Sequence, residues 1–456
     1  MHFQKQIVLA TAIGIISITT VHATDDASQR GGPVLTQWGA DRAGNKEGTI
    51  PAYTGERTKA PANWNPAKPG QRPDPFGEKP LFTITAQNAA QYADKLDGSI
   101  ELFKRYPDYR MDIYPTHRTW TFPQYVLDNT AKNLTACKAT DKTELKLEGC
   151  YGGLPFPLPK TGNQAMWDHL LSYQAWNLKG HAENWLVPPK SDAVMVERGL
   201  FLYNWPYYDP DKKGPRPSNA LYWRFLGKDE APARLAGGQM LLHDAVDQLN
   251  IGRSAWLYMT GRRWVKIAAE LAYDTPNPFT ANSATMDDAQ GFSGALDRFD
   301  FKLIGKKEKF IYYNNFDLVN QAACPAEKLT ATKGFPNPAC IRWELHRVWV
   351  VEATLKPGVK HLYHKRIFYW DEDGFASGQT ESYDGTKMIR LNNIITYPYF
   401  EALGAFSVSD IFQDIDTNTY TVTGVGTCND CGWSPIAERI PEQTFSPDAM
   451  AGGGIR

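Results

Sequence analysis

The chain has 456 residues, 42% of them hydrophobic, with 49 basic and 50 acidic side chains and a formal net charge of −1. This length and hydrophobic fraction allow one large or two ordinary domains with a buried core. Because the charge is near neutral, there is no electrostatic basis for binding nucleic acid, and partners of that class are excluded.

The N-terminus has the pattern of a secretory signal peptide. Lys5 precedes an uncharged apolar run at 7–18, and the segment ends in Val21-His22-Ala23. A basic start, a short apolar core and a small residue on either side of position 22 are typical of a cleaved signal. We therefore expect residues 1–23 to be removed and the mature chain to be soluble in the periplasm. An uncleaved membrane anchor is the alternative, although the apolar run is short for a membrane span.

Residues 24–80 are rich in Gly, Pro and polar side chains and show little periodicity, which predicts an extended arm laid over a surface. Helical periodicity follows, with the predicted helices at 85–106, 122–134 and 164–176. Strand patterns then dominate, at 191–203, 222–226, 254–259 and 263–268, and in a hairpin of 300–304 and 310–313 around Gly305.

The most regular pattern lies at 342–395. Two long aromatic runs, 342–355 and 361–370, flank the turn signal Pro357-Gly358, and Asp373-Gly374 and Asp384-Gly385 mark two more turns. The segment therefore predicts an antiparallel meander. Period-two alternation places large apolar side chains and one arginine on the same face of its first strand. The candidate ligand contacts on that face are Trp343, Leu345, Arg347, Trp349 and Val351.

Early helices followed by antiparallel strands predict an α+β fold, with residues 81–456 as a single domain. We expect helices mainly at 85–176, the sheet mainly at 190–400, and a C-terminal tail that contains cysteines. A broad curved sheet of this kind either packs on helices or lines an apolar ligand cavity, and the pattern alone leaves both open.

Six cysteines form three pairs that are close in sequence. Fifteen connectivities are possible, and the simplest prediction pairs neighbours: Cys137 with Cys150, Cys324 with Cys340, and Cys428 with Cys431. Cys428-Asn-Asp-Cys431 could instead be a redox motif, which requires its first thiol at a helix N-terminus. Glycines on both sides and a Ser-Pro after the motif indicate no helix there, which favours a structural disulfide.

Several long segments of the chain resemble an exported proteobacterial family. They are 38–55, beginning Trp-Gly-Ala-Asp-Arg; 74–85; 109–118; 272–278; 294–303; and 342–355. The family is catalogued as domain of unknown function 1329 and is grouped with the LolA/LolB-like carriers. The resemblance covers nearly the whole mature chain. It implies an open, strongly curved antiparallel half-barrel closed by helices over an apolar cavity, with a role in lipid or lipoprotein transport.

The sequence contains no convincing catalytic or metal motif, so we predict no cofactor, catalytic set or metal site. Gly291-Phe-Ser-Gly294 lacks the spacing of a hydrolase nucleophile elbow. His361 and His364 would point to opposite faces of a strand, which prevents them from sharing one ion. The Asp414-Ile-Asp416 segment has Thr419 where a calcium loop requires glycine, which favours a turn.

Arg347 has two interpretations. A charge on an apolar face must be paired, stacked or exposed to water. It is either a polar anchor for a ligand inside the cavity, or a structural arginine stacked on aromatics or paired with a carboxylate.

The favoured function is a periplasmic carrier or chaperone that binds a lipid, lipoprotein or other hydrophobic molecule and transfers it to a membrane partner, such as an envelope transporter or outer-membrane protein. The alternatives are an exported hydrolase, with dispersed residues such as His117, His243 and Asp244, and a carbohydrate-binding protein.

Overall fold

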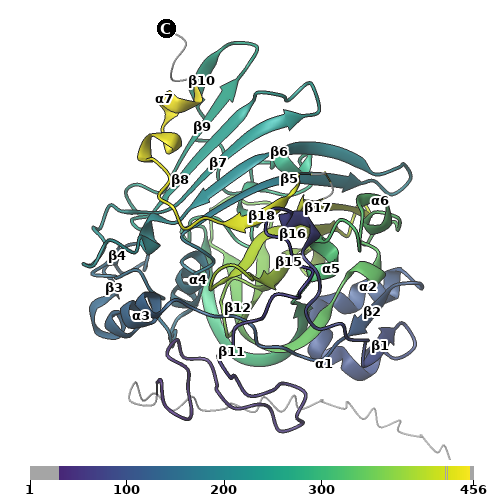
Figure 1. Ribbon diagram of the computed structural model, residues 1–456. Coiled ribbons are helices and arrows are strands. Elements are labelled where there is room, and N and C mark those ends of the chain that lie inside the picture. The colour runs from purple at the N-terminus through teal and green to yellow at the C-terminus, as the bar shows by residue number, and fades with distance from the viewer. Residues whose placement is uncertain (1–29, 427, 429, 452–456) are drawn as a thin grey trace, which may run out of the picture.

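The computed structural model describes residues 30–426, 428 and 430–451, and its main feature is one very large sheet (Figure 1). This sheet has 16 strands in the order β1-β2-β12-β13-β14-β15-β16-β17-β5-β6-β7-β8-β9-β10, with β11 paired to β12 and β18 paired to β5. Its strands are β1 (Phe82–Thr85), β2 (Arg110–Ile113), β5 (Asn177–Val187), β6 (Val194–Asn204), β7 (Leu221–Ala231), β8 (Gln239–Ala245), β9 (Arg253–Met259), β10 (Trp264–Ile267), β11 (Phe299–Tyr312), β12 (Trp343–Leu355), β13 (Lys365–Asp371), β14 (Gly378–Asp384), β15 (Lys387–Pro398), β16 (Ala405–Asp414), β17 (Thr419–Val425) and β18 (Gly432–Pro435).

The sheet is open and almost entirely antiparallel. A single parallel pairing, Trp343 with Ile113, connects β12 to β2. A separate two-stranded sheet contains β3 (Lys138–Ala139) and β4 (Leu147–Glu148).

Helices are few and short. The α-helices are α1 (Ala93–Leu96), α2 (Ile100–Arg105), α3 (Gln124–Ala136), α4 (Gly162–Leu170), α5 (Phe316–Val319), α6 (Ala326–Leu329) and α7 (Pro447–Met450). The 3-10 helices are η2 (Pro69–Gln71), η3 (Ala89–Tyr92), η4 (Asp97–Ser99), η5 (Pro206–Tyr208), η6 (Pro278–Thr280), η7 (Met286–Asp288), η8 (Pro338–Cys340) and η9 (Glu442–Phe445). The predicted α+β class with a large curved antiparallel sheet is confirmed.

Both faces of the sheet are covered at β12 and β13. On one face, α4 packs through His169, whose ring stacks on Trp370 with 3.6 Å between centroids. On the opposite face, Lys309 of β11 donates to the carbonyl oxygen of Leu96 at the end of α1. Strand alternation places Val348 on this second side, in a small separate hydrophobic cluster.

The meander predicted at 342–395 is confirmed, because β12, β13, β14 and β15 pair in succession. The helix predicted at 85–106 is wrong in extent. It is divided among η3, α1, η4 and α2, with Asp97 at a positive φ of 48°. Gly98 lies so close to Glu381 of β14 that a Cβ would approach that carboxyl group within 2.6 Å. Tertiary packing therefore interrupts the local helical periodicity.

The hairpin predicted around Gly305 is also wrong. The two segments form one continuous strand, β11, that pairs along the whole of β12, with a register shift between Leu303 and Gly305. Gly305 has a φ of 133°, and the extra residue beside it forms a β-bulge instead of a turn. A glycine between two strand patterns fits either structure, and the long partner strand β12 decides between them.

The structure joins each cysteine to its sequence neighbour, as expected from the sequence. The disulfides are Cys137–Cys150, Cys324–Cys340 and Cys428–Cys431, with sequence separations of 13, 16 and 3. The first closes the segment between α3 and the residues after β4, and the second closes the segment from α6 to η8.

We expect the stabilisation by each disulfide to follow the length of the loop it closes. Replacing Cys137 and Cys150 together by Ala should lower the free energy of unfolding by roughly 3 kcal/mol, and replacing Cys428 and Cys431 by roughly 2 kcal/mol, because a shorter loop restricts the unfolded chain less. Urea unfolding of the two double variants tests this. A larger loss for the Cys428–Cys431 pair than for the Cys137–Cys150 pair would contradict it.

Candidate functional site: a cleft bounded by the N-terminal arm

The apolar residues predicted as ligand contacts lie in the main core. Trp343, Leu345, Trp349 and Val351 are all buried, and they pack against other side chains of the protein. Trp343, for example, meets the ring of Tyr312 edge-on at 4.4 Å between centroids. None of them lines either of the two pockets described below.

Arg347 is paired with protein groups. Its Nε donates to Glu372 at 2.7 Å, and its Nη2 donates to the backbone carbonyl oxygens of Asp41 and Ala43. Both of those carbonyls belong to the N-terminal arm, residues 30–80, which contains η2 but no strand or other helix. Arg347 therefore fastens the arm to the sheet.

Glu372 is the centre of this attachment. It lies 2.7 Å from Lys306 and 3.3 Å from Arg118, and it accepts a hydrogen bond from the backbone N–H of Asp41 at 3.2 Å. Burial of Glu372 disfavours its charged form, but attraction to Lys306, Arg347 and Arg118 outweighs this effect and lowers the pKa of Glu372 to about 2. The carboxylate is thus charged at neutral pH.

Arg118 adds a second attachment. Its Nε and Nη2 donate to the two carboxylate oxygens of Asp373 at 2.7 and 2.6 Å, and its Nη1 donates to the carbonyl oxygen of Asp41 at 2.8 Å. Bidentate arginine–carboxylate pairs fix geometry strongly. We call Arg118, Lys306, Arg347, Glu372 and Asp373 the arm-anchoring network. In Figure 1 the arm, in dark purple, lies beside β11 and continues to β18.

A cleft of about 380 Å³ lies where the arm meets the domain. Its walls come from the arm, the residues at the start of α3 and the turn between β15 and β16. The lining residues are Gly31, Gln37, Trp38, Arg42, Tyr53, Gly55, Thr121, Phe122, Leu127 and Leu403.

Aromatic side chains form the floor of the cleft. The buried Trp38 ring lies 5.0 Å from Tyr53 and 4.8 Å from Phe122, centroid to centroid. The next residue, Gly39, has a φ of 89°, and a Cβ there would lie 1.9 Å from the carbonyl oxygen of Pro157. Only glycine allows this close approach, which holds Trp38 in place.

Polar side chains also line the cleft, among them Gln37, Arg42 and Thr121. The Tyr53 hydroxyl donates to the carbonyl oxygen of Trp120, and Arg42 Nε donates to the carbonyl oxygen of Gly32. Within the described residues, the buried Trp38 Nε1–H has no hydrogen-bond partner. A cleft lined by both aromatic and polar side chains suits a hydrophobic ligand that also carries a polar group.

The second pocket, of about 30 Å³, is much smaller. It includes the acidic side chains Asp74, Glu78 and Asp317 together with Arg342. Burial and the neighbouring Asp74 raise the pKa of Asp317. This volume holds about one water molecule and excludes a lipid chain.

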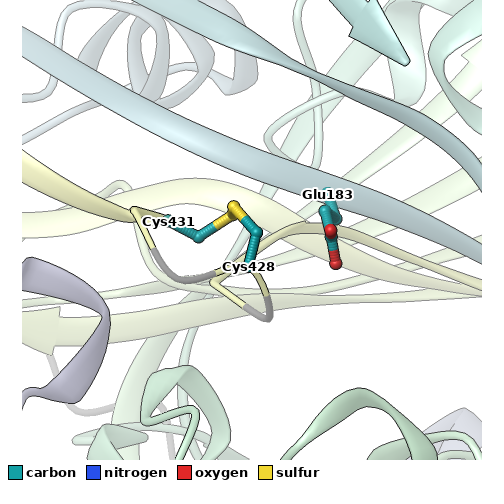
Figure 2. Close-up of side chains that lie close together, drawn as sticks. All are labelled: Glu183, Cys428 and Cys431. Atoms are coloured by element: carbon teal, nitrogen blue, oxygen red, sulfur yellow. A yellow bond between two sulfur atoms is a disulfide. The ribbon is translucent and has the colours of Figure 1, made fainter. Parts of the chain in front are cut away.

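Two groups of side chains have metal-ligand proximity within the part of the chain that the structure describes. The first group contains His346, Asp371 and Asp373. Burial by itself lowers the pKa of His346, but hydrogen bonds to Asp371 and Glu344 have the larger effect and raise that pKa to about 9. A protonated imidazole has no free lone pair for a metal, and Asp373 is already held by Arg118. In the second, Glu183 lies beside Cys428 and Cys431, whose sulfurs form a disulfide (Figure 2).

The side chains considered for a hydrolase have separate partners. His117 Nε2 lies 2.9 Å from Glu78, and Asp244 binds Arg253 at 2.8 and 2.7 Å. His243 Nε2 lies 2.9 Å from the carbonyl oxygen of Phe445. None of these contacts pairs a candidate nucleophile with a base.

The histidines at 361 and 364 also have different partners. His361 Nε2 lies 2.9 Å from Asp287, whereas His364 Nδ1 lies 2.9 Å from Asp384. The Asp414 carboxylate accepts from the backbone N–H of Thr417, in the turn between β16 and β17. These contacts agree with the structural interpretations made from the sequence.

Sequence reasoning missed the cleft because its walls come from residues 31–55, 121–127 and 403, which are far apart in the chain. The available signal was Trp38 with its following glycine, in the first segment that resembles the family. Periodicity could not reveal this signal, because the arm has neither helix nor strand there.

Comparison with known proteins identifies close and distant relatives. The family model described as "Protein of unknown function (DUF1329)" matches residues 83–451. Uncharacterized protein PA3922 of Pseudomonas aeruginosa is 34% identical over 456 residues and covers 98% of both chains.

Similarity to solved structures is weaker. A DUF1329 family protein from Desulfovibrio piger is 12% identical, covers 60% of this chain and 92% of its own, and has a TM-score of 0.37. A LolA superfamily protein from Nitrosomonas europaea is 11% identical, covers 64% and 100%, and has a TM-score of 0.36. Neither similarity by itself defines the fold or function of this chain.

Among the described residues, every helix is too short or too polar to cross a bilayer. The predicted signal peptide, residues 1–23, lies outside the residues that the structure describes.

The arm-anchoring network predicts a pH-dependent stability. Because the pKa of Glu372 is lowered in the folded protein, its contribution is present above the unfolded value near 4.3 and is lost as the pH falls through about 2. Glu372→Gln should therefore lower the free energy of unfolding by roughly 3 kcal/mol at neutral pH, and by much less near pH 2. Urea unfolding at both pH values measures this difference.

Glu352→Gln is the matched control, because Glu352 is partly exposed and pairs with Lys365 on the same sheet. This substitution should change the free energy of unfolding by less than about 1 kcal/mol at either pH. An equal loss for Glu372→Gln at both pH values would show that the charge of Glu372 is not what stabilises the arm.

Proposed function

This chain belongs to the DUF1329 family of proteins of unknown function, and we propose that it is a periplasmic carrier that binds a hydrophobic molecule, such as a lipid or lipoprotein chain, in the cleft beside its N-terminal arm. The observation that supports this proposal is the cleft itself, with about 380 Å³ of space against Trp38, Phe122 and Leu403. That volume is within the range of about 300–1,000 Å³ that small-molecule sites occupy.

Binding in this cleft requires no chemical step. Each Å² of apolar ligand surface removed from water contributes roughly 25 cal/mol, and the cost of association offsets part of this gain. Binding would thus depend on apolar burial, and release would reverse it without a chemical step.

Export to the periplasm is supported by two features. Three disulfides join all six cysteines, and disulfides persist in oxidising compartments such as the periplasm. The N-terminal sequence has the pattern of a cleaved signal. A carrier in this compartment needs a membrane partner that accepts its ligand, and we propose an envelope transporter or outer-membrane protein for this role.

The face of β12 that carries Trp343, Leu345, Arg347, Trp349 and Val351 is the proposed second contact surface. The protein's own side chains, including those of α4, cover this face, so a ligand would reach it only if that packing opened. Arg347 is the β12 residue that holds the arm, through the carbonyl oxygens of Asp41 and Ala43. It would therefore position the arm beside this face instead of contacting a headgroup.

The cleft predicts a specific loss of binding. Leu403→Asp places a charge in the cleft wall, where Leu403 is half-buried. It should weaken binding of a naphthylamine fluorescent probe by at least about tenfold, because burying an apolar side chain contributes about 1.5–3 kcal/mol. Fluorescence titration of the folded variant gives the affinity.

Leu249→Asp is the matched control, since Leu249 is 52% exposed and does not line the cleft. Its probe affinity should equal that of the unmodified protein. Equal weakening by both variants, or no probe binding to the unmodified protein, would remove the basis for a carrier.

Arg347→Ala tests the role of the arm. Loss of this side chain removes two contacts to the arm backbone but leaves Glu372 bound to Lys306 and Arg118. We expect faster proteolytic cleavage near residues 41–43 and faster exchange of bound probe, with the circular dichroism spectrum unchanged. Arg347→Lys should give an intermediate result, because lysine keeps the charge but loses the fork of donors. Unchanged cleavage and exchange in both variants would show that Arg347 does not hold the arm.

A further inference from the structure

The short disulfide Cys428–Cys431 differs from the other two in its surroundings. It closes a loop with only two intervening residues, between β17 and β18, and it lies beside Glu183 of β5 (Figure 2). A carboxylate oxygen of Glu183 and the two sulfurs all lie within 4.8 Å of one another. The disulfides Cys137–Cys150 and Cys324–Cys340 are not in such a group within the described residues.

The two cysteines of this disulfide are unequally exposed. Cys431 is 2% exposed, whereas Cys428 is half-buried. The arm packs closely behind Cys431: a Cβ on Gly70 would lie 2.1 Å from the Cys431 carbonyl oxygen, and one on Gly432 would lie 2.1 Å from the Gly70 nitrogen. Cys428 is therefore the more accessible of the two residues to an incoming thiol.

From this geometry we infer that Cys428–Cys431 is a reversible thiol–disulfide exchange site, with Cys428 as the attacked sulfur and Glu183 as the proton carrier for Cys431. The substrate class is a protein or small-molecule dithiol. This inference is independent of ligand binding in the cleft.

The environment of Glu183 suits proton transfer. The residue is buried, and its Oε2 accepts from the Trp185 indole N–H at 3.2 Å. Burial raises the pKa of Glu183, and the charges of Glu327 and Asp430 act in the same direction, whereas the Trp185 hydrogen bond and Arg198 oppose them. No helix begins at Cys428 to stabilise a thiolate. A nearby carboxyl group that can protonate the leaving sulfur would replace that stabilisation.

The exchange balances in two steps. A partner thiol gives its proton to Glu183, its sulfur bonds to Cys428, the Cys428–Cys431 bond breaks, and Cys431 takes the electron pair and the proton from Glu183. The second thiol of the partner then attacks the partner sulfur of this mixed disulfide, and Cys428 leaves with the second proton. The partner dithiol is oxidised to a disulfide by two electrons, and the cysteine pair is reduced to two thiols.

The test uses the folded, oxidised protein and dithiothreitol, with alkylation at successive times and peptide mapping of the labelled cysteines. Cys428 and Cys431 should be labelled at least about tenfold faster than the other four cysteines, because exchange depends on access to the attacked sulfur. Glu183→Gln should slow this labelling several-fold at neutral pH. Glu438→Gln, at an exposed position after β18 that does not act on Glu183, is the matched control and should leave the rate unchanged.

A second variant tests the assignment of the attacked sulfur if Glu183→Gln does not fold. Cys431→Ser should form a stable mixed disulfide with glutathione at Cys428, detected as a mass increase, while Cys428→Ser should form far less adduct at the buried Cys431. Reduction of all three disulfides at the same rate would overturn the inference. So would equal labelling rates in Glu183→Gln and the unmodified protein, or equal adduct formation in the two serine variants.

Discussion

The buried carboxylate of Glu372 connects the N-terminal arm to the sheet, and the geometry of the cleft depends on that connection. A charge in the interior is costly unless it is paired and hydrogen-bonded. Glu372 meets this requirement with Lys306, Arg347 and Arg118, and it also accepts the backbone N–H of Asp41. Because Arg118 and Arg347 donate to carbonyl oxygens of the arm as well, the same charges that satisfy Glu372 fix the position of residues 41–43.

This attachment places Trp38 against Phe122 and so forms the wall of the cleft. The arm has no strand or α-helix whose backbone bonds could hold it, so side chains from the domain must do so. Glu372, Arg118 and Asp373 are almost completely buried, so separating them would leave unpaired charges in the interior, which is costly. The attachment of the arm is therefore firm.

The arm also touches the sheet at a second place, where Gly70 packs against Cys431 and Gly432. The cleft and the Cys428–Cys431 disulfide therefore contact different parts of one extended segment. Arg72, close to this second contact, is fully buried and forms two hydrogen bonds to Glu401, in the turn that also supplies Leu403 to the cleft. A change at either end of the arm would alter packing near the turn between β15 and β16.

The sequence by itself determined the elements whose pattern is local. Alternation identified β12 and its apolar face, the turn signals identified the meander from β12 to β15, and the spacing of the cysteines indicated their pairing. Only the tertiary structure decided what lies against those elements. Gly305 forms a bulge because the long strand β12 is its partner, and Arg347 binds the arm because Asp41 and Glu372, far apart in sequence, meet beside it. Periodicity shows on which side of a strand a residue lies. The segments that pack against that side come from distant parts of the chain, and no local pattern encodes them.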